Sequence, residues 1–169
     1  MEGTRLTGRV TVNECAWPAA FTPETAAFAR AARGFCAFVN DASSHSLVER
    51  VLTARVLLNA LYGAALQLPE SERETEGDIP ATATPESWPG FEKHELYWEV
   101  CNPYDDEPRV AGELTDDVVD VYRDIRRGLT FWENGDLADA VWEWRLSFES
   151  HWGDHAIDAL RALHRAARR

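Results

Sequence analysis

Carboxylate and imidazole side chains gather in the last third of the chain, on two segments that repeat at helical spacing. Asp117, Asp120 and Asp124 are three and four residues apart, so a helix places them together on one flank. His151 and His155 are four residues apart and project from one side of a later helix. Carboxylate oxygens and imidazole nitrogens are common ligands of divalent metal ions. The pattern therefore raises the hypothesis of a metal centre between two helices.

Ordinary structural roles account for the same side chains. Arg123 and Arg127 each follow an aspartate by three residues, so local ion pairs are expected along that helix. A buried histidine is expected to hydrogen-bond an acid such as Asp117 or Asp124 from the adjacent helix. The sequence contains neither H-E-x-x-H nor the Glu-x-x-His of di-iron bundles. The ligand set therefore matches no established metal motif, and both readings stay open.

A second group of candidate binding residues lies beside tryptophans in the same late segment. Arg145 is flanked by acids and aromatic rings, and is expected to stack on a ring while pairing with a carboxylate. Such a contact would fix two helices in register, or would line a polar notch for a ligand or partner. The candidates for that notch are Asp117, Asp120, Asp124, Glu143, Arg145, Glu149 and Trp152.

The segments that carry these residues are predicted to be helices. Thr22-Pro23 and the pair Ser46 and Glu49 are helix-start signals, because each offers a hydroxyl N-cap. The predicted fold is all-α, a single five-helix, bundle-like domain over 22–169 that follows an N-terminal extension at 1–21. The predicted helices span 22–40, 46–68, 89–102, 114–132 and 136–165, with a turn at 103–112 between the third and the fourth.

The last predicted helix, 136–165, has an unusually small polar face. One apolar stripe runs through Trp144, Phe148, Trp152 and His155, and an opposite stripe contains Trp142, Leu146, Ile157 and Leu160. A helix that is apolar on two sides is buried between neighbours or lies in an interface, so we expect it at the centre of the bundle. Packing against a second copy through the opposite stripe is the alternative. Gly153 interrupts this helix and predicts a kink or a close helix approach.

Residues 70–89 separate the second and third predicted helices and are rich in Glu, Thr and Pro. A stretch of this length without regular structure is uncommon inside a compact domain, so it is expected to be a mobile loop or a lid.

Composition narrows the class of protein. The formal net charge is −12 over 169 residues, which argues against nucleic acid as a partner and favours a basic protein or a cation. No window approaches the roughly 18 apolar residues of a membrane span, so no membrane partner is expected. Three widely spaced cysteines fit reduced thiols in a cytoplasmic protein, with Cys36 buried.

Four stretches resemble a bacterial family described as a domain of unknown function. They are LYGAALQLP (61–69), NPYDDEP (102–108), LTDDVVDVYRDI (114–125) and AVWEWRLSFESHWGDHAIDALRALH (140–164). The resemblance covers most of residues 24–167 and implies a helical domain from a bacterium. It implies no activity and no catalytic residue. At position 102 this chain has Asn where the family pattern has an acid. The difference weakens the hypothesis that the acids of the following turn, Asp105, Asp106 and Glu107, help to hold a cation.

Two functions are compatible with these patterns. The first is a non-enzymatic cytosolic binding or accessory protein without a cofactor, which contacts a basic protein partner through its acidic surface, in the manner of an immunity protein or antitoxin. The second is a metal-dependent hydrolase that acts on phosphoesters or nucleotides. Its divalent cation would be held by Asp117, Asp120, Asp124, His151 and His155.

Overall fold

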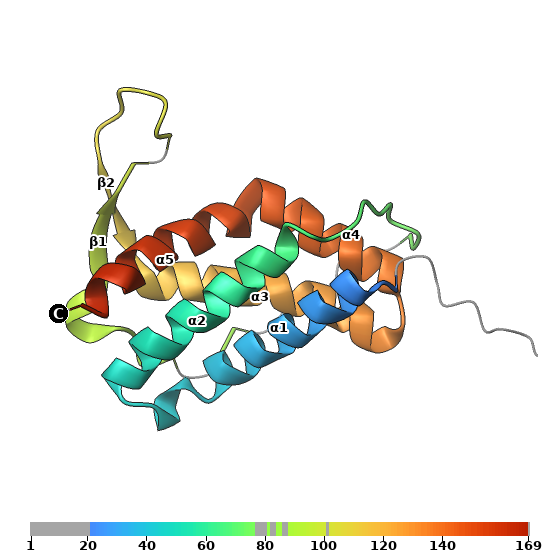
Figure 1. The fold of residues 1–169 in the computed structure, drawn as a ribbon, viewed down its shortest axis with the longest axis horizontal. Helices are drawn as coiled ribbons and strands as arrows, with labels where there is room; N and C mark the ends of the chain where they lie inside the picture. Colours follow the sequence, from blue (N-terminus) through green and yellow to red (C-terminus); the bar gives the residue numbers. More distant parts are fainter. Residues whose placement is uncertain (1–20, 77–80, 82–83, 86–87, 101, 169) are drawn as a thin grey trace, which may run out of the picture.

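The computed structural model describes residues 21–76, 81, 84–85, 88–100 and 102–168. Its α-helices are α1 (Pro23–Asn40), α2 (Leu47–Ala65), α3 (Leu114–Asn134), α4 (Leu137–Ser147) and α5 (Gly153–Ala166). Two 3-10 turns (Ala42–Ser44 and Glu92–His94) and two strands, β1 (Leu96–Glu99) and β2 (Val110–Glu113), complete the regular structure of these residues. Figure 1 shows long helices lying side by side, with the β1–β2 hairpin projecting from one end of the bundle.

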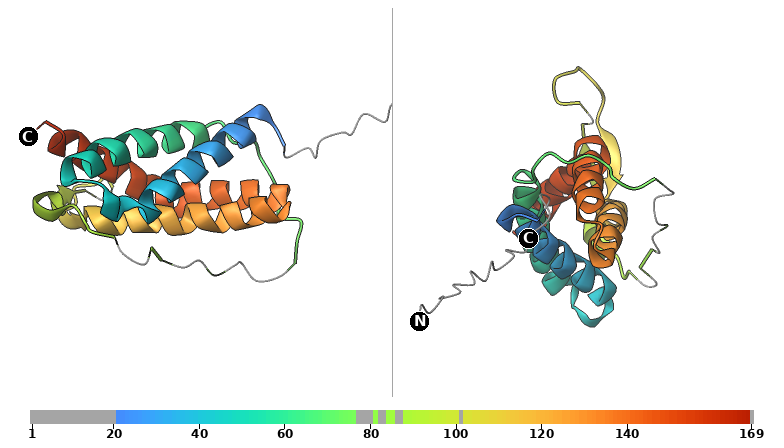
Figure 2. Two further views of the ribbon diagram at one scale, coloured as in Figure 1. Left: turned by 90° about the horizontal axis from the view of Figure 1, so that it is seen from below. Right: turned by 90° about the vertical axis from the view of Figure 1, so that its right-hand side faces the viewer.

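The helices form a closed ring of contacts around one core. α1 packs on α2 and α3, while α5 packs on α2 and α3, so each of these rods has two neighbours. α4 lies against α3 and leads into α5 through a π-helical turn at Phe148–Trp152. The two views of Figure 2 show this arrangement from the side and from the end. In the described residues the bundle therefore has four long rods, the last of which is α4 and α5 joined.

Both predicted helix starts on α1 and α2 are confirmed. The Thr22 hydroxyl accepts from the backbone N–H of Thr25, and the Ser46 hydroxyl accepts from that of Glu49. In each case the side chain of the residue three positions later accepts a hydrogen bond from the backbone N–H of the cap residue. This pair of bonds is a capping box. The first turn of each helix is thus specified locally by the sequence.

The prediction of a third helix over 89–102 is wrong. Glu92–His94 is a 3-10 turn, and Leu96–Glu99 forms β1, which pairs antiparallel with β2 so that Tyr97 lies opposite Gly112. The end of the predicted turn at 103–112 is likewise part of a strand. Alternation of side chains along β1 has period two, which a helical wheel does not reveal. The fold is therefore mostly helical with a small two-stranded sheet, and neither all-α nor built of five separate helices.

The two tryptophans on the first apolar stripe of the last rod face the core, as predicted. Trp144 and Trp152 are fully buried, and the ring of Phe28 on α1 lies 4.7 Å and 6.3 Å from theirs. Aromatic side chains of this size dominate the burial energy of a small core. Cys36 is also buried, as expected, and burial raises the pKa of its thiol to about 12.

The π-helical turn changes which side of the rod faces the core. A π turn contains an extra residue, so everything after it is rotated relative to a continuous α-helix. Trp152 is therefore buried while Phe148 is only half-buried, and His155 leaves the core. The opposite apolar stripe is not enclosed, because Leu146 and Ile157 are 46% and 47% exposed. The prediction of burial on both sides is thus wrong.

Gly153 is required by the π turn itself. A Cβ at this position would lie 2.4 Å from the carbonyl oxygen of Phe148, which is far inside van der Waals contact. The kink that the sequence predicts at this glycine is therefore present as a change of helical pitch. No neighbouring helix is needed to explain it.

The described part of the 70–89 segment is held against α4. The backbone N–H of Glu74 donates to the Asp139 carboxylate at 2.6 Å, and the Ser71 hydroxyl donates to the carbonyl of Ala138 at 2.9 Å. Within the predicted lid or mobile loop at 70–89, residues 77–80, 82–83 and 86–87 lie outside the described residues, and the described ones contain no regular secondary structure, as expected. The predicted extension at 1–21 also lies outside them, apart from Phe21. No helix in the described ranges is long and apolar enough to span a membrane.

The contact between α3 and α4 depends on Gly128. A Cβ there would lie 2.1 Å from the indole nitrogen of Trp144, so Gly128→Ala should destabilise the protein by about 1–3 kcal/mol through overpacking. Gly63 on α2 is the matched control, because its Cβ would meet nothing within 4 Å. Gly63→Ala should stabilise by about 0.4–1 kcal/mol. Urea unfolding measures both values, and equal effects would contradict this account of the helix contact.

Candidate metal centre

Two histidine–carboxylate pairs join α5 and the π turn to α3. The Nδ1 atom of His155 lies 2.9 Å from an Asp117 oxygen, and the Nδ1 atom of His151 lies 2.7 Å from an Asp124 oxygen. Asp117 and Asp124 are both buried, two turns apart on α3. The expectation of a histidine bonded to one of these acids is therefore confirmed, and both histidines fulfil it.

The pairs fix the orientation of each imidazole ring. A carboxylate only accepts hydrogen bonds, so each Nδ1 must carry the donated proton. The Nε2 atom of each neutral ring then keeps its lone pair and points away from the carboxylate. Metal-binding histidines are held in this way, by a carboxylate on the nitrogen that does not bind the metal.

A third acid, Asp120, completes a group of three metal-binding side chains. One ligand atom from each of Asp120, His151 and His155 lies within 4.8 Å of the other two. The Nε2 atom of His155 is 3.9 Å from an Asp120 oxygen, and the two imidazole rings are 4.8 Å apart, edge to face. Ligands at about 2.0–2.2 Å from one ion lie at most about 4.4 Å apart, so binding by all three would require these side chains to move slightly closer together.

The cluster is open to solvent on one side. The His151 side chain is 48% exposed, while His155 and Asp120 are half-buried. Three protein ligands leave a coordination position for water, which is the arrangement of catalytic rather than structural metal sites. The arrangement can therefore hold a metal ion and present a bound water to an incoming molecule.

The structure gives the three acids of α3 two different roles. The metal hypothesis takes all three as direct ligands, but Asp117 and Asp124 each accept a hydrogen bond from an imidazole Nδ1, and Asp120 is the acid that forms a group with both histidines. The predicted local ion pairs are confirmed, because Asp120 pairs with Arg123 and Asp124 pairs with Arg127. The Asp120 oxygen nearest to His155 is the one that Arg123 does not contact.

Glu143 belongs to the support of the cluster. Its carboxylate is buried on α4 and lies 2.9 Å from the Nε of Arg127, which also pairs with Asp124. Burial raises the pKa of Glu143, while the Arg127 charge opposes that rise. The arginine thus links the two acids and holds Asp124 in place beneath His151.

The other predicted binding residues are not brought to the cluster. Arg145 and Glu149 pair with each other at 3.0 Å on the exposed side of the rod, and Trp152 is fully buried. Trp152 therefore cannot contact a partner. The pairing of Arg145 with a carboxylate is confirmed, while the arginine that lies over a ring in this region is Arg73, 5.5 Å from the ring of Trp142, and not Arg145 as expected.

Tyr97 and Glu99 on β1 extend the support and were not predicted. The Tyr97 hydroxyl lies 2.7 Å from both the Asp117 and the Glu99 carboxylates, so it connects the hairpin to the acid behind His155. Burial and these two bonds raise the pKa of Tyr97. Gly112 makes room for this contact, because a Cβ there would lie 2.6 Å from the tyrosine ring. The available signal was the alternation of residues 96–99, which we assigned to a helix.

A mostly helical bundle with a histidine–carboxylate cluster between two of its rods is the class of protein that this fold and site define. The chain belongs to the family described as Domain of unknown function (DUF5063), whose model matches residues 19–168. The family resemblance seen in the sequence is thereby confirmed.

The fold is similar to that of a solved bacterial protein. The crystal structure of protein BF1032 from Bacteroides fragilis, a structural genomics target, matches with a TM-score of 0.72 at 23% sequence identity. The match covers 86% of this chain and 93% of that chain, so the likeness extends over the whole bundle and shows a shared fold. The comparison with curated proteins gave no match.

The His155–Asp117 pair predicts how stability depends on pH. The hydrogen bond to Asp117 raises the pKa of His155 against the opposing effect of burial, and the charges of Asp117, Asp120 and Asp116 add to the rise. When the pKa of a histidine is higher in the folded state, the resulting stabilisation is fully present below the unfolded-state pKa near 6.5. It is lost as pH rises through the folded-state pKa. The free energy of unfolding of the metal-free protein should therefore fall as pH rises above about 6.5 and through the folded-state pKa of His155.

Urea unfolding at several pH values measures this dependence. In His155→Gln the decline over that range should be smaller, because the titrating group is gone. An unchanged slope in the variant would show that His155 does not carry the effect.

Proposed function

We propose that this protein binds one divalent transition-metal ion through Asp120, His151 and His155, and that the metal activates water for hydrolysis. One observation carries the proposal: Asp117 and Asp124 each hold one imidazole by its Nδ1, and both of these histidines lie in one cluster with Asp120, where the Nε2 of His155 is 3.9 Å from the Asp120 carboxylate. Exposed acids and histidines often gather without a metal. A pair of rings each fixed by its own buried carboxylate is a more specific arrangement.

The donor set favours one group of metals. Two nitrogen ligands and one oxygen ligand suit zinc, iron, cobalt or nickel, whereas magnesium and calcium prefer all-oxygen sites. A hard cation held by carboxylates alone is therefore less well supported than a transition metal.

Hydrolysis follows from the open coordination position. A metal with three protein ligands lowers the pKa of its bound water to about 7, and so supplies hydroxide at neutral pH. Such a hydroxide would attack an electrophilic carbon, and the proton lost by the water would leave with the departing group. The negative charges of Asp117, Asp120 and Asp124 near the site would disfavour an anionic phosphoester. A neutral ester or amide fits the site better than the phosphoesters or nucleotides considered from the sequence.

Calorimetric titration of the metal-free protein with Zn²⁺ tests the metal site. The wild type should bind one ion, and His151→Ala, His155→Ala and Asp120→Asn should each lose most of the affinity because a ligand is removed. Asp117→Asn and Asp124→Asn, which alter only the support, should bind about 10–100-fold more weakly. His94→Ala changes a histidine in the 3-10 turn before β1 and should bind as the wild type.

Wild-type affinity in His155→Ala would contradict the proposed ligands. The hydrolytic step is tested separately, with 4-nitrophenyl acetate as a model ester. The Zn²⁺-loaded protein should hydrolyse it faster than the metal-free protein, and the gain should vanish in Asp120→Asn. Zinc binding without any gain in the rate of ester hydrolysis would support the metal site and contradict the hydrolase.

A second candidate function is binding of a basic protein partner, favoured by the loop between β1 and β2. Tyr104 is 95% exposed at the tip of this projecting loop and is followed by Asp105, Asp106 and Glu107. The Asn102 side chain accepts from the Tyr104 N–H at 3.1 Å and donates to Asp105, so the tip has a defined turn. An exposed aromatic residue beside acids is a common anchor in interfaces. A partner neutralised by an immunity-type or antitoxin-like protein would have the required basic surface.

Affinity capture from a lysate of the source organism tests this candidate. The wild-type chain should retain a basic protein at low salt and release it at moderate salt, because exposed charges are screened. Tyr104→Ala should reduce the retained amount of the same protein, while Tyr62→Phe in the bundle should not. Capture that is equal with Tyr104→Ala would contradict a role for the loop.

A further inference from the structure

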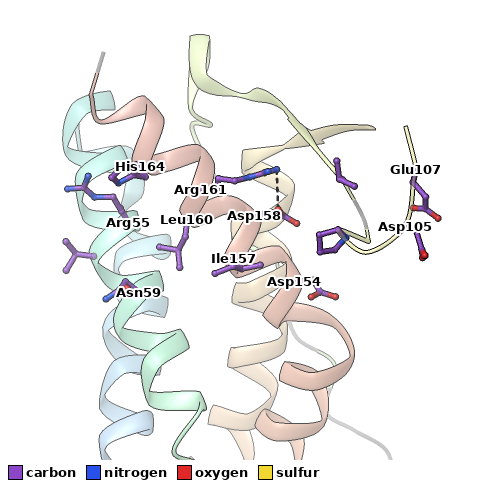
Figure 3. Close-up of a pocket in the computed structure, with 13 residues that line it drawn as sticks. Arg55, Asn59, Asp105, Glu107, Asp154, Ile157, Asp158, Leu160, Arg161 and His164 are labelled. Atoms are coloured by element: carbon purple, nitrogen blue, oxygen red, sulfur yellow. Dashed lines mark ion pairs between the residues drawn. The ribbon is translucent and has the colours of Figure 1, made fainter. Parts of the chain in front are cut away.

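A groove lies between α2, α5 and the loop that joins β1 to β2, and its lining residues do not include Asp120, His151 or His155. Figure 3 shows it lined from all three elements, and its volume is about 1190 Å³. Cavities of this size suit a ligand of drug size or a short peptide. Val56 on α2 and Ile157 on α5 expose much of their side chains into it, so its floor is apolar.

The charges along the groove change sign from one end to the other. Asp154, Ile157, Arg161 and His164 are three or four residues apart on α5, and form one stripe along the groove. The stripe therefore runs from an acid, over an apolar residue, to Arg161 and His164, and Arg161 is paired at 3.5 Å with Asp158, which also lines the groove. In a chain with a net charge of −12, a basic end of this kind is distinctive.

The other two elements strengthen both ends. Arg55 of α2 lies next to His164 in Figure 3, at the basic end, where the two helices run side by side. At the opposite end the loop brings Asp105 and Glu107 to the same side as Asp154. The basic residues Arg55 and His164 thus lie at one end of the groove, and the acids Asp154, Asp105 and Glu107 lie at the other.

We propose that this groove binds an extended peptide of four or five residues with a free carboxyl terminus. The carboxylate would pair with Arg55 and His164, apolar side chains would lie on Val56 and Ile157, and a basic group would face Asp154. From Asp154 to His164 the helix rises about 15 Å, which matches four or five extended residues at about 3.3 Å each. Guanidinium groups bind carboxylates in paired, charge-assisted hydrogen bonds.

The opposite charges at the two ends of the groove favour a peptide over a polyanion or a purely apolar molecule. A polyanion would be repelled by Asp154, Asp105 and Glu107, and a purely apolar molecule would leave both charged ends without complements. An extended peptide carries opposite charges at its two ends with apolar side chains between them. On α5 the groove stripe lies about a third of a turn from His151 and His155, so peptide binding does not depend on the proposed metal.

Fluorescence anisotropy with metal-free, full-length protein tests the proposal. The probe is the pentapeptide Lys-Ala-Leu-Val-Leu, labelled on the side chain of its lysine through a flexible linker that keeps the α-amine free. We expect saturable binding to the wild type. The same peptide with a C-terminal amide should bind at least about tenfold more weakly, because a charge-assisted bond is lost. An unlabelled peptide with an acetylated N-terminal glutamate in place of lysine should displace the probe less effectively than the unlabelled parent peptide.

Matched variants locate the contacts. Arg55→Gln and His164→Gln should each reduce the difference between the acid and amide peptides, while Arg33→Gln, on the exposed side of α1, should leave it unchanged. Ile157→Ser should weaken both peptides, whereas Leu146→Ser, of similar exposure outside the groove, should not.

Three results would overturn the inference. They are the absence of saturable binding by the wild type, equal affinities for the acid and the amide, and full discrimination in both Arg55→Gln and His164→Gln. Circular dichroism of each variant establishes that it is folded, and two separate variants at the basic end guard against the loss of one. Because no metal is present, failure here leaves the proposed metal centre unaffected.

Discussion

The contact of the Trp144 indole with α3 at Gly128 sets the position of the last rod in this protein. The indole N–H donates to the carbonyl of Ile125 at 3.1 Å, and it occupies the space that any larger residue at 128 would fill. Because interiors are close-packed, such a contact permits little sliding between the two helices. The alignment of α3 with the rod is thereby determined near one end, and the two histidine–carboxylate pairs follow from it further along.

The π turn converts this alignment into a site. α4 faces α3 with buried residues, and a continuous α-helix would go on burying the same side. The extra residue in Phe148–Trp152 rotates α5, so that Trp152 and Ala156 fill the core while His151 and His155 lie over the acids of α3. π turns are rare and frequently occur at functional sites. Here the turn costs some helix regularity, and Gly153 is the residue that makes it sterically feasible.

Much of the fold could be predicted from local signals. The capping boxes at Thr22 and Ser46 and the period of 3.6 on α3 are properties of short segments, and they placed those helices well. The strand at Leu96–Glu99 was missed because four residues give too little periodicity, and its pairing with Val110–Glu113 depends on residues distant in sequence. The π turn was missed because a helical wheel assumes one constant rotation per residue.

The sequence predicted which residues form the candidate site, but it could not predict how their side chains are oriented. Spacing alone placed Asp117, Asp120 and Asp124 near His151 and His155, and the structure brings all five together. Which acid faces the open nitrogens and which lies behind the rings depends on the rotation of two helices about their axes. Tyr97 enters the site from an element that the sequence had assigned to a helix. Exposure of Ile157 and the polarity of the groove likewise required the path of the hairpin loop.

The orientation of the two imidazoles is the central claim, and nitrogen-15 NMR of the histidine side chains tests it most directly. In the metal-free protein, at a pH where both rings are neutral, His151 and His155 should carry the proton on Nδ1, the tautomer less common in water, because Asp124 and Asp117 accept it. Addition of Zn²⁺ should then shift the Nε2 resonances. Protons on Nε2 in both rings, with no change on adding zinc, would contradict the account.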